Sequence, residues 1–478
     1  MYAQVSRYHG ERQSSAVAAN FVNSLMLPMN SGSSLSRRSF LKHLGTAGIL
    51  APAFVRNLIS APPSGRIRLA SFGAGGMAWS DLSALLAHPN ADLVCVAEVD
   101  SGRLSKLAER DTEKKVRVYA DWRELLEKEA RQLDAVSVAT PDHMHAPIGA
   151  SAMQLGLHAY IQKPLAHDLY EVRRLQEIAR EKRVLTQMGI QVHSSAQYQS
   201  AVKLMQSGVI GKIREVHTWS NKKWGDSAPA PKESAPAPAE LQWDLWLGVA
   251  ASRPFVPGVY QGGSWRKRLD FGTGTFGDMG CHIYDPVFEG LQLKAPLSVR
   301  SEGTPPNDWS WSTDALIHYT FEGNPLIEGP TLPITWYDGD QKPPAHIGAL
   351  LGGQPLPGQG SLLVGTKGVL LLPHVDWPKL FPVADFKDFA YEKVPAADHR
   401  AQFLDAILGK GTPSAGFDYS GPLTETVLLG GAATFFPQTT LRWDSAALRF
   451  LDKPEAQKLV RRTYRSGWEV RGLSEPRA

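Results

Sequence analysis

A strand that leads directly into a glycine-rich turn constrains this chain more than any other sequence feature. Residues 66–72 (RIRLASF) form a mainly apolar run that ends at Gly73-Ala74-Gly75-Gly76-Met77-Ala78. In such a segment Gly73 makes the tight turn, Gly75 lets the backbone approach a ligand, and Ala78 takes a third position that accepts alanine as well as glycine. We therefore expect a strand, turn and helix that hold a dinucleotide pyrophosphate at the helix N-terminus.

An acidic residue ends the next expected strand. The apolar run covers 93–99, and Glu98 stands twenty residues beyond Ala78. A carboxylate at this offset accepts hydrogen bonds from a ribose diol, and Asp100 is the competing candidate. Because an acid repels a 2′-phosphate, we expect NAD as the cofactor. Arg103 nearby keeps NADP as the less favoured alternative.

Strand-like apolar runs alternate with helical patterns from the glycine turn to about residue 190. These runs cover 93–99, 135–139, 158–161 and 185–188. Such alternation is typical of a doubly wound parallel sheet with helices on both faces. We therefore assign residues 66–188 to a Rossmann domain.

Strands dominate the chain from about residue 212 onward. Turn signals such as Glu322-Gly323-Asn324 separate them, which favours antiparallel pairing. We expect surface loops over the proline-rich tract 228–239 and over much of 341–360. The fold class is therefore α/β, with an N-terminal Rossmann doubly wound parallel sheet and, over 189–478, a C-terminal α+β domain with a large mostly antiparallel sheet. The expected strands of this domain are 214–219, 298–301, 315–321, 334–337, 362–365 and 368–372, and the expected helices are 399–408 and 422–435.

The chain also carries a pattern typical of a bacterial twin-arginine leader. The run Ser36-Arg37-Arg38-Ser39-Phe40-Leu41-Lys42 precedes a modestly apolar stretch over 44–59. Leaders of this kind direct folded proteins to the export machinery. We therefore expect residues 1–65 to be a leader and linker, and the protein to act in the periplasm or another extracytoplasmic compartment. The stretch before Ser31 is long for a leader, so Met29 is a candidate start.

The charge balance excludes two classes of partner. Residues 1–63 hold six of the 51 basic and one of the 47 acidic residues, so the mature chain is nearly neutral. Neither nucleic acid nor an anionic membrane surface is therefore an expected partner. No apolar run reaches the roughly 18 residues that a membrane-spanning helix needs, so we expect no membrane segment in the mature form. Cys95 and Cys281 are expected to be buried thiols rather than a disulfide.

Several further motifs resemble the Gfo/Idh/MocA family of sugar and inositol dehydrogenases, over nearly all of the chain after the leader. They are Thr140-Pro141-Asp142-His143-Met144-His145, Gln162-Lys163-Pro164, Gly277-Asp278-Met279-Gly280-Cys281-His282 and Phe417-Asp418-Tyr419-Ser420-Gly421-Pro422-Leu423. The last two, with Trp243-Asp244-Leu245-Trp246-Leu247-Gly248, resemble the branch that carries twin-arginine leaders. The resemblance implies a C-terminal α/β domain whose open sheet often supports homo-oligomers, with the substrate held between that sheet and the nicotinamide.

The resemblance also implies positions at the cofactor. Asp142 and His143 would lie beside the nicotinamide ribose. The family's Glu-Lys-Pro is Gln162-Lys163-Pro164 here, and this departure removes a carboxylate beside the lysine. The residues that we expect at the cofactor are Gly73, Gly75, Gly76, Met77, Glu98, Asp100, Thr140, Pro141, Asp142, His143, Gln162 and Lys163.

Three residues can supply the chemistry of alcohol oxidation. The hydroxyl proton must leave while hydride leaves the same carbon, so a base and a cation must meet at one oxygen. Asp278 and His282 share a face if the chain is helical from Phe276 onward, which matches the family's Asp-x-x-x-His spacing. We expect His282 to accept the proton, Asp278 to orient substrate hydroxyls or the imidazole, and Lys163 to polarise the substrate oxygen. Taken singly, Lys163 would be interpreted as a solvated lysine and His282 as a core histidine.

A metal site is not expected. His143 and His145 alternate after a strand, which is one pattern of a metal pair. No acidic third ligand stands nearby in the sequence, and such histidines are more often loop residues.

Tryptophans concentrate in one part of the second domain, where seven of the 13 lie between residues 219 and 311. Flat rings with an N–H stack on sugar faces, although they are more often packing anchors. We expect one or two of them, with Arg266 and Arg268, to line a carbohydrate site.

Export would separate the protein from a replenished pool of NAD, so the cofactor must stay bound through turnover. We therefore expect an exported NAD(P)-dependent oxidoreductase that transfers hydride between a tightly bound nicotinamide and a secondary hydroxyl of a sugar, glycoside or cyclitol. One alternative is an NAD-dependent glycosidase that uses a transient keto-sugar. An alternative from another class is a non-catalytic sugar-binding or scaffold protein.

Overall fold

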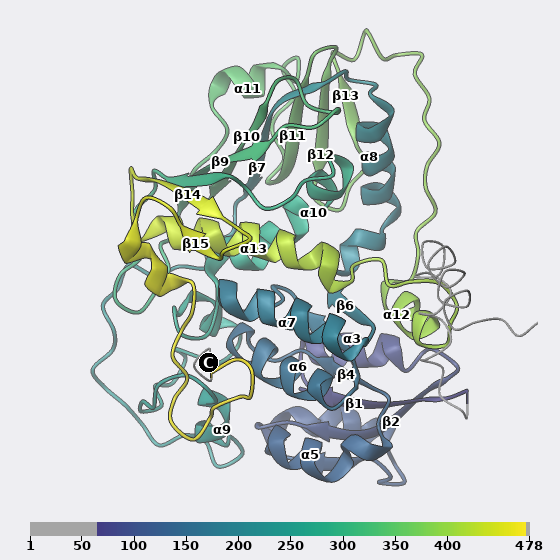
Figure 1. Cartoon of the computed structure of the whole chain (residues 1–478), viewed down its shortest axis with the longest axis vertical. Coiled ribbons are helices and arrows are strands. Elements are labelled where there is room, and N and C mark those ends of the chain that lie inside the picture. The colour runs from purple at the N-terminus through teal and green to yellow at the C-terminus, as the bar shows by residue number, and fades with distance from the viewer. Residues whose placement is uncertain (1–64, 475–478) are drawn as a thin grey trace, which may run out of the picture. The chain divides into compact units, whose positions relative to one another are not determined.

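The glycine turn follows the first strand of a six-stranded parallel sheet (Figure 1). All neighbouring strands of this sheet run parallel, in the order β3-β2-β1-β4-β5-β6, which confirms the predicted doubly wound arrangement. The strands are β1 (Ile67–Phe72), β2 (Ala91–Ala97), β3 (Arg117–Tyr119), β4 (Ala135–Val138), β5 (His158–Gln162) and β6 (Thr186–Gly189). The computed structural model describes residues 65–474. The predicted leader over 1–65 lies outside the described residues, apart from Gly65.

The helices between these strands begin and end at recognisable signals. Asp168 and Glu171 form a capping box at the start of α7, and Arg183 ends that helix in the left-handed conformation. The helices of this part are α3 (Met77–Leu85), α4 (Ser105–Arg110), α5 (Trp122–Glu129), α6 (His145–Gln154) and α7 (Leu169–Lys182). Because β2 and β4 flank β1 on opposite sides, the strand order reverses there, and parallel sheets bind ligands at such a point.

A second sheet of nine strands forms the other layer, and it is mostly antiparallel as predicted. Its order is β13-β12-β11-β7-β10-β9-β8-β14-β15, in which β7 and β10 form a parallel pair and the other recorded pairs are antiparallel. The strands are β7 (Ile213–Ser220), β8 (Ser298–Ser301), β9 (Ala315–Glu322), β10 (Thr331–Asp338), β11 (Gln359–Gly365), β12 (Val369–Pro373), β13 (Lys379–Phe381), β14 (Thr440–Asp444) and β15 (Arg449–Phe450).

Helix α13 connects the two sheets. It packs against α7 and β6 on one side and against β8 and β9 on the other, and in Figure 1 it crosses between the two layers. One hydrophobic core therefore continues from the Rossmann strands into the second sheet. The remaining helices are α8 (Ala196–Ser207), α9 (Trp243–Leu247), α10 (Cys281–Gly290), α11 (Ala345–Ala349), α12 (His399–Ile407) and α13 (Phe417–Thr434).

Two expectations about these elements need correction. Helix α13 begins at Phe417 rather than at residue 422, so Pro422 lies inside the helix instead of at its first position. Proline is favoured at the first position of a helix, which places a start at Pro422, but the helix begins five residues earlier, after Gly416. The short helix α11 also interrupts the 341–360 stretch that was expected to be a loop.

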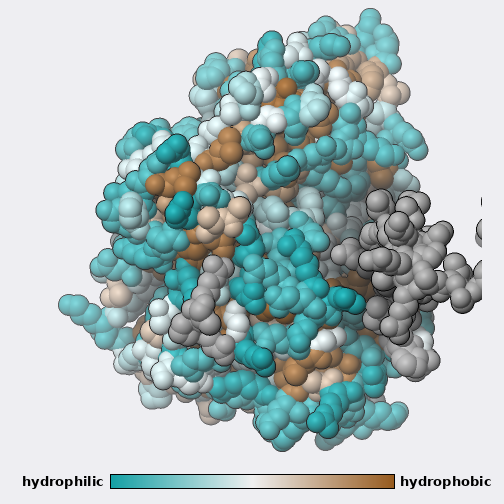
Figure 2. All heavy atoms as spheres, in the orientation of Figure 1, coloured by the Kyte–Doolittle hydropathy of each residue, from teal (hydrophilic) through white to brown (hydrophobic). Residues whose placement is uncertain are grey.

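Cys95 and Cys281 are both buried free thiols, and burial raises the pKa of each to about 12. None of the helices within residues 65–474 is long and apolar enough to cross a bilayer. The face over α6 and α7 is mostly hydrophilic, with apolar residues gathered in separate patches (Figure 2).

Candidate active site

A cavity of about 940 Å³ lies where β1, β4 and β5 end, and it extends to the second sheet. Every residue predicted to bind the cofactor or to act in catalysis lines this cavity, except His143. Those that line it are Gly73, Gly75, Gly76, Met77, Glu98, Asp100, Thr140, Pro141, Asp142, Gln162, Lys163, Asp278 and His282. The structure therefore brings the glycine turn, the lysine and the Asp-x-x-x-His pair to one place.

The glycine turn has the geometry that an approaching phosphate needs. Gly73 has φ 100°, and a Cβ there would lie 2.9 Å from the Cβ of Ala78. Helix α3 starts at Met77 without a capping side chain and without an acid in its first turn. The Ala78 N–H donates to the Gly75 carbonyl oxygen at 3.1 Å, but no side chain caps the first turn of the helix, so the residues present fit a bound dinucleotide.

The two acids after β2 contact the protein itself. Glu98 Oε2 accepts a hydrogen bond from the Ala74 N–H (2.8 Å), and Oε1 accepts from the Asp100 N–H (3.0 Å). Burial raises the pKa of Glu98. Asp100 Oδ2 accepts from Arg103 Nε at 3.1 Å. Glu98 therefore connects the glycine turn to the end of β2 through hydrogen bonds. This is the place where the sequence predicts a ribose.

The loop after β4 is fixed from both domains. Asp142 accepts a hydrogen bond from Thr273 Oγ1 (2.7 Å), and its pKa is raised by burial. The ring nitrogens of His145 lie 2.8 Å from the carbonyl oxygens of Pro164 and Thr140, so this side chain connects two loops of the cavity wall.

His143 lies away from the cavity wall, contrary to its predicted place beside the ribose. Its ring is fully buried and packs against Trp246 and Phe271, with centroids 5.7 and 5.0 Å away. The residues Asp142–Met144 form a 3₁₀ turn, which places neighbouring side chains in different directions. Asp142 therefore faces the cavity while His143 enters an aromatic cluster.

Lys163 and Asp278 form a buried ion pair between the two domains. Lys163 follows β5, and Asp278 stands in a π-helical turn (Phe276–Gly280) that continues into α10. Lys163 Nζ donates to Asp278 Oδ1 (2.8 Å) and to its backbone carbonyl (2.7 Å). The side chains are 10% and 9% exposed, so the ammonium group is held in one position at the cavity wall.

Asp278 also accepts hydrogen bonds from three residues that the sequence motifs did not include in the catalytic group. Arg266 Nε contacts Oδ1 at 3.2 Å, and Trp224 Nε1 and Lys222 Nζ contact Oδ2 at 2.8 and 3.3 Å. Burial opposes the charged carboxylate, but Lys163, Arg266 and Lys222 hold the pKa of Asp278 well below its ordinary value. Both carboxylate oxygens of Asp278 accept hydrogen bonds from these lysine, arginine and tryptophan donors. Within the described chain no hydrogen bond joins Asp278 to His282.

His282 is buried beside a second histidine. Burial, then Lys163 and His374, keep the pKa of His282 well below its ordinary value, so its ring is neutral at neutral pH. Its Nδ1 has no hydrogen-bond partner in the described structure. A neutral imidazole at this position can accept a proton.

His374 is a site residue that the sequence did not indicate. It follows β12, and the centroid of its ring lies 6.0 Å from that of His282. The Tyr198 hydroxyl lies 2.6 Å from His374 Nδ1, and burial, Lys222 and Lys163 lower the pKa of His374 to about 4.

The tryptophan-rich segment divides between the cavity and the packing of loops. Trp224, Trp246 and Trp265 line the cavity with Arg266, so three rings of this segment reach it where one or two were expected. Arg268 does not line it, because its guanidinium pairs with Asp226 at 3.0 Å. The other tryptophans of the segment, Trp219, Trp243, Trp309 and Trp311, donate their N–H groups to backbone carbonyls.

Gln162 has a structural partner that accounts for the departure from Glu-Lys-Pro. Its Nε2 donates to Asp81 Oδ2 at 2.6 Å, and Arg400 donates to Asp81 Oδ1 at the same distance. Asp81 is fully buried on α3, and burial raises its pKa against the opposing effect of Arg400. A glutamate at position 162 would therefore face another buried carboxylate.

We expect Gln162→Glu to lower the unfolding free energy by about 1–3 kcal/mol at neutral pH, because a buried hydrogen bond becomes a repulsive contact. The repulsion raises the pKa of the carboxylate pair in the folded protein. The loss of stability should therefore become smaller as the pH falls and the carboxylate pair takes up a proton. Thermal unfolding of both proteins across acidic and neutral pH measures this. The charge swap Asp81→Asn with Gln162→Glu should restore part of the stability, and an unchanged midpoint in the single variant would contradict the assignment.

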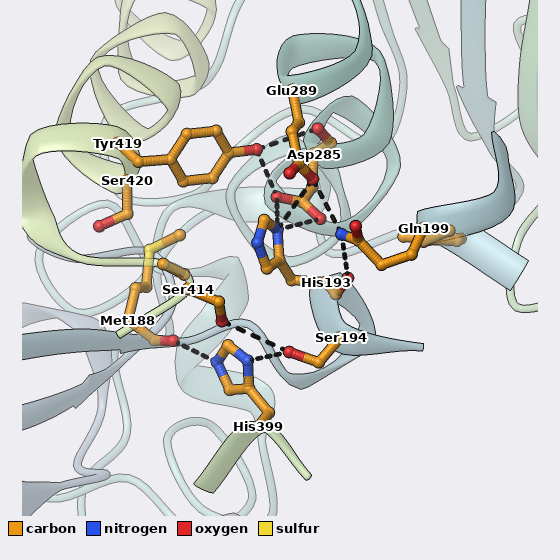
Figure 3. A network of polar contacts seen from close by, with 12 residues as sticks. Met188, His193, Ser194, Gln199, Asp285, Glu289, His399, Ser414, Tyr419 and Ser420 are labelled. Carbon is orange, nitrogen blue, oxygen red and sulfur yellow. Dashed lines mark hydrogen bonds and ion pairs between the residues drawn. The ribbon is translucent and has the colours of Figure 1, made fainter. Parts of the chain in front are cut away.

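A buried ion pair joins α10 to the segment that follows β6 (Figure 3). His193 Nδ1 lies 2.9 Å from Asp285 Oδ1, and the side chains are 3% and 1% exposed. The Tyr419 hydroxyl donates to the same carboxylate at 2.7 Å. Asp285 stands three residues after His282 in α10, and His193 directly follows Gln191 and Val192, which line the cavity. The pair therefore fixes two walls of the site.

Two family models match the chain, and together they cover more than half of it. The first, "Oxidoreductase family, NAD-binding Rossmann fold", matches residues 67–190. The second, "Oxidoreductase family, C-terminal alpha/beta domain", matches residues 195–327.

The chain is similar to curated proteins over shorter stretches. It is 30% identical over 150 residues to inositol 2-dehydrogenase of Rubrobacter xylanophilus, which covers 31% of this chain and 42% of that protein. It is 23% identical over 205 residues to glycosyl hydrolase family 109 protein 1 of Shewanella sp., which covers 37% of this chain and 44% of that protein. The matches thus span less than half of the length of each relative.

A solved structure shares the fold. The WlbA dehydrogenase of Bordetella pertussis, in complex with NADH and UDP-GlcNAcA, superposes with a TM-score of 0.55 at 16% identity, over 79% of this chain and 98% of that chain. Because the two models match successive parts of the chain in the order of its two sheets, this protein belongs to the Gfo/Idh/MocA family of oxidoreductases, and its first domain is the family's NAD-binding Rossmann fold.

Proposed function

We propose that this protein is an exported oxidoreductase that retains its nicotinamide cofactor and transfers hydride between it and a secondary hydroxyl of a sugar, glycoside or cyclitol. The meeting of Lys163, Asp278 and His282 with the glycine turn in one cavity carries this proposal. The likeness to an inositol dehydrogenase supports a polyhydroxylated substrate. The twin-arginine pattern over 36–42 supports the location.

Each side chain has a distinct task in this reaction. The neutral ring of His282 accepts the hydroxyl proton. The Lys163 ammonium stabilises negative charge on the substrate oxygen, and Asp278 holds that ammonium in place. A bound nicotinamide dinucleotide would supply the hydride acceptor, and the residues that would hold it are those at the start of α3 together with Glu98 and Asp142.

A glycosidase that uses the same cofactor is the second candidate, supported by the likeness to a family 109 glycosyl hydrolase. Oxidation of a sugar hydroxyl to a ketone, with hydride passing to the nicotinamide, acidifies the neighbouring C–H, and loss of that proton expels the aglycone by elimination. Addition of water to the resulting double bond and return of the hydride to the ketone complete a net hydrolysis. Aryl glycosides separate the two candidates. The glycosidase is favoured if phenol is released while no reduced nicotinamide accumulates and a deuterium label on the C–H is exchanged.

The proposal is tested on protein isolated from the extracytoplasmic fraction of its natural host. We expect a stoichiometric amount of NAD by mass spectrometry, and sugars that change the absorbance of its nicotinamide ring. The variant Arg37→Lys/Arg38→Lys should remain in the cytoplasm and still carry the cofactor, because folding precedes export on this route. Protein that holds no nicotinamide, binds none when it is added and shows no redox change with any sugar would refute the proposed activity.

A further inference from the structure

The substrate half of the cavity contains more positive than negative charge. Three cations, Lys163, Lys222 and Arg266, contact the single carboxylate of Asp278 within 2.8–3.3 Å. Asp142 is the other acid at this end, and its carboxylate accepts a hydrogen bond from Thr273. Cations therefore outnumber carboxylates here even when both acids are ionised.

The remaining acids of the cavity wall lie at its other end. Glu98 contacts the Ala74 and Asp100 N–H groups, and Asp100 pairs with Arg103. These residues follow β2, at the end expected for the adenosine ribose. They are engaged with their own neighbours and do not balance Lys222 and Arg266.

Two of these cations also act on the two histidines of the site. After burial, the nearby lysines are a main cause of the lowered pKa values of His282 and His374. Lys163 and Lys222 act on both rings, so these groups lie in one electrostatic environment. An anion bound there would relieve repulsion among the cations.

Lys222 and Arg266 are placed for contact with a ligand as well as with Asp278. Lys222 follows β7, and its side chain is 42% exposed. Arg266 is 28% exposed, and its guanidinium stacks on Trp265 at 4.3 Å from the ring centroid. A stacked guanidinium keeps N–H groups free for a planar or tetrahedral anion. Holding Lys163 requires only Asp278, so the two further cations are not needed for that ion pair.

We propose that the substrate carries an anionic group, a carboxylate or a phosphate, and that Lys222 and Arg266 bind it. This inference deepens the proposed function and rests on it. It assigns an acidic sugar, rather than a neutral hexose or a neutral cyclitol, to the cavity beside the nicotinamide. Hexuronates and hexose phosphates are the two sources of this chemistry.

The test uses the purified full chain with its bound nicotinamide and a panel of matched sugars. The panel contains hexuronates, their uncharged methyl esters, hexose phosphates and the parent hexoses. We expect about a 10- to 100-fold higher single-turnover kcat/KM for the anionic member of the correct pair, which falls as the salt concentration rises. The arm that reacts, uronate or phosphate, identifies the source.

Two neighbouring lysines provide a matched comparison. Lys222→Gln should lower kcat/KM for the anionic substrate about 10- to 100-fold more than it lowers kcat/KM for the uncharged analogue, and the additional loss should come mainly through KM. Lys223 pairs with Asp340 at 2.7 Å and does not line the cavity. Lys223→Gln should therefore leave both substrates unchanged.

The results separate this inference from the proposed function. Equal rates with charged and uncharged sugars, or an equal loss for both in Lys222→Gln, would overturn the anionic substrate and leave the oxidoreductase intact. Suppose that calorimetry detects binding of a hexuronate or hexose phosphate, that this binding weakens in Lys222→Gln, and that no redox change accompanies it. That result would support the anion site and contradict the proposed hydride transfer. Absence of binding for every anionic sugar would overturn the inference.

Discussion

Replacing Lys163 by Met should lower the rate of hydride transfer by about 10²- to 10⁴-fold, the range for a positioned acid–base or charge-stabilising group. Lys163 Nζ is fixed by the carboxylate and the backbone carbonyl of Asp278, at 2.8 and 2.7 Å. A methionine of similar length fills the space but cannot stabilise charge on the substrate oxygen. Single-turnover absorbance of the bound nicotinamide after substrate addition measures the rate.

The comparison variant is Lys203→Met, on an exposed position of α8. It should keep the wild-type rate and cofactor content. Lys163→Met should also keep its cofactor, because Lys163 Nζ contacts Asp278 and the substitution leaves the glycine turn and the start of α3 intact. A full rate together with a lower unfolding temperature in Lys163→Met would mean that this lysine serves packing rather than catalysis.

The Rossmann half of the fold could be predicted because its signals are local. The strand at Ile67–Phe72, the glycine turn and the helix from Met77 are contiguous, and each strand of the sheet except β3 forms a recognisable apolar run. The exception, β3, has three residues of which two are exposed, so it carries no apolar pattern. Short edge strands of this kind depend on pairing with β2 and not on their own composition.

The catalytic group could be predicted only in part, because the rest of it is assembled by long-range strand pairing. Lys163, Asp278 and His282 stand in contiguous motifs that resemble the family. Lys222 and His374 follow β7 and β12, which lie on either side of β11 in the second sheet. No pattern in the sequence connects these positions, and only the sheet register brings their side chains near Asp278 and His282.

Replacing Asp285 by Asn should lower the unfolding free energy by about 3–5 kcal/mol, the usual effect of removing one partner from a buried ion pair. Burial opposes the charge on His193, but Asp285 and then Glu289 raise the pKa of His193 from 6.5 to about 9. The facing groups are Asp285 and Glu289 of α10, Tyr419 of α13 and the neutral ring of His399, whose pKa is lowered to about 3. Without Asp285 the buried ring loses its main counter-charge.

The pH dependence of this effect has a defined sign. A pKa raised by folding stabilises the protein fully below the unfolded value of 6.5, and this contribution disappears as the pH rises through about 9. Wild-type stability should therefore decline over this window, and the Asp285→Asn variant should lack that decline. Urea unfolding at several pH values measures it. The exposed pair Arg442–Asp452 is the control, and Asp452→Asn should leave the profile unchanged over the same window.

A double variant distinguishes an ion pair from simple packing. If the charge on His193 is the cause, His193→Gln combined with Asp285→Asn leaves no unpaired buried charge, and it should be more stable than Asp285→Asn alone. Additive losses would contradict the pairing. Because Asp285 follows His282 by one helical turn of α10, and Gln191 and Val192 precede His193 at the cavity wall, the single variant should also lower kcat more than a remote destabilising change does. The buried pair would then determine the position of the proton acceptor as well as the stability of the fold.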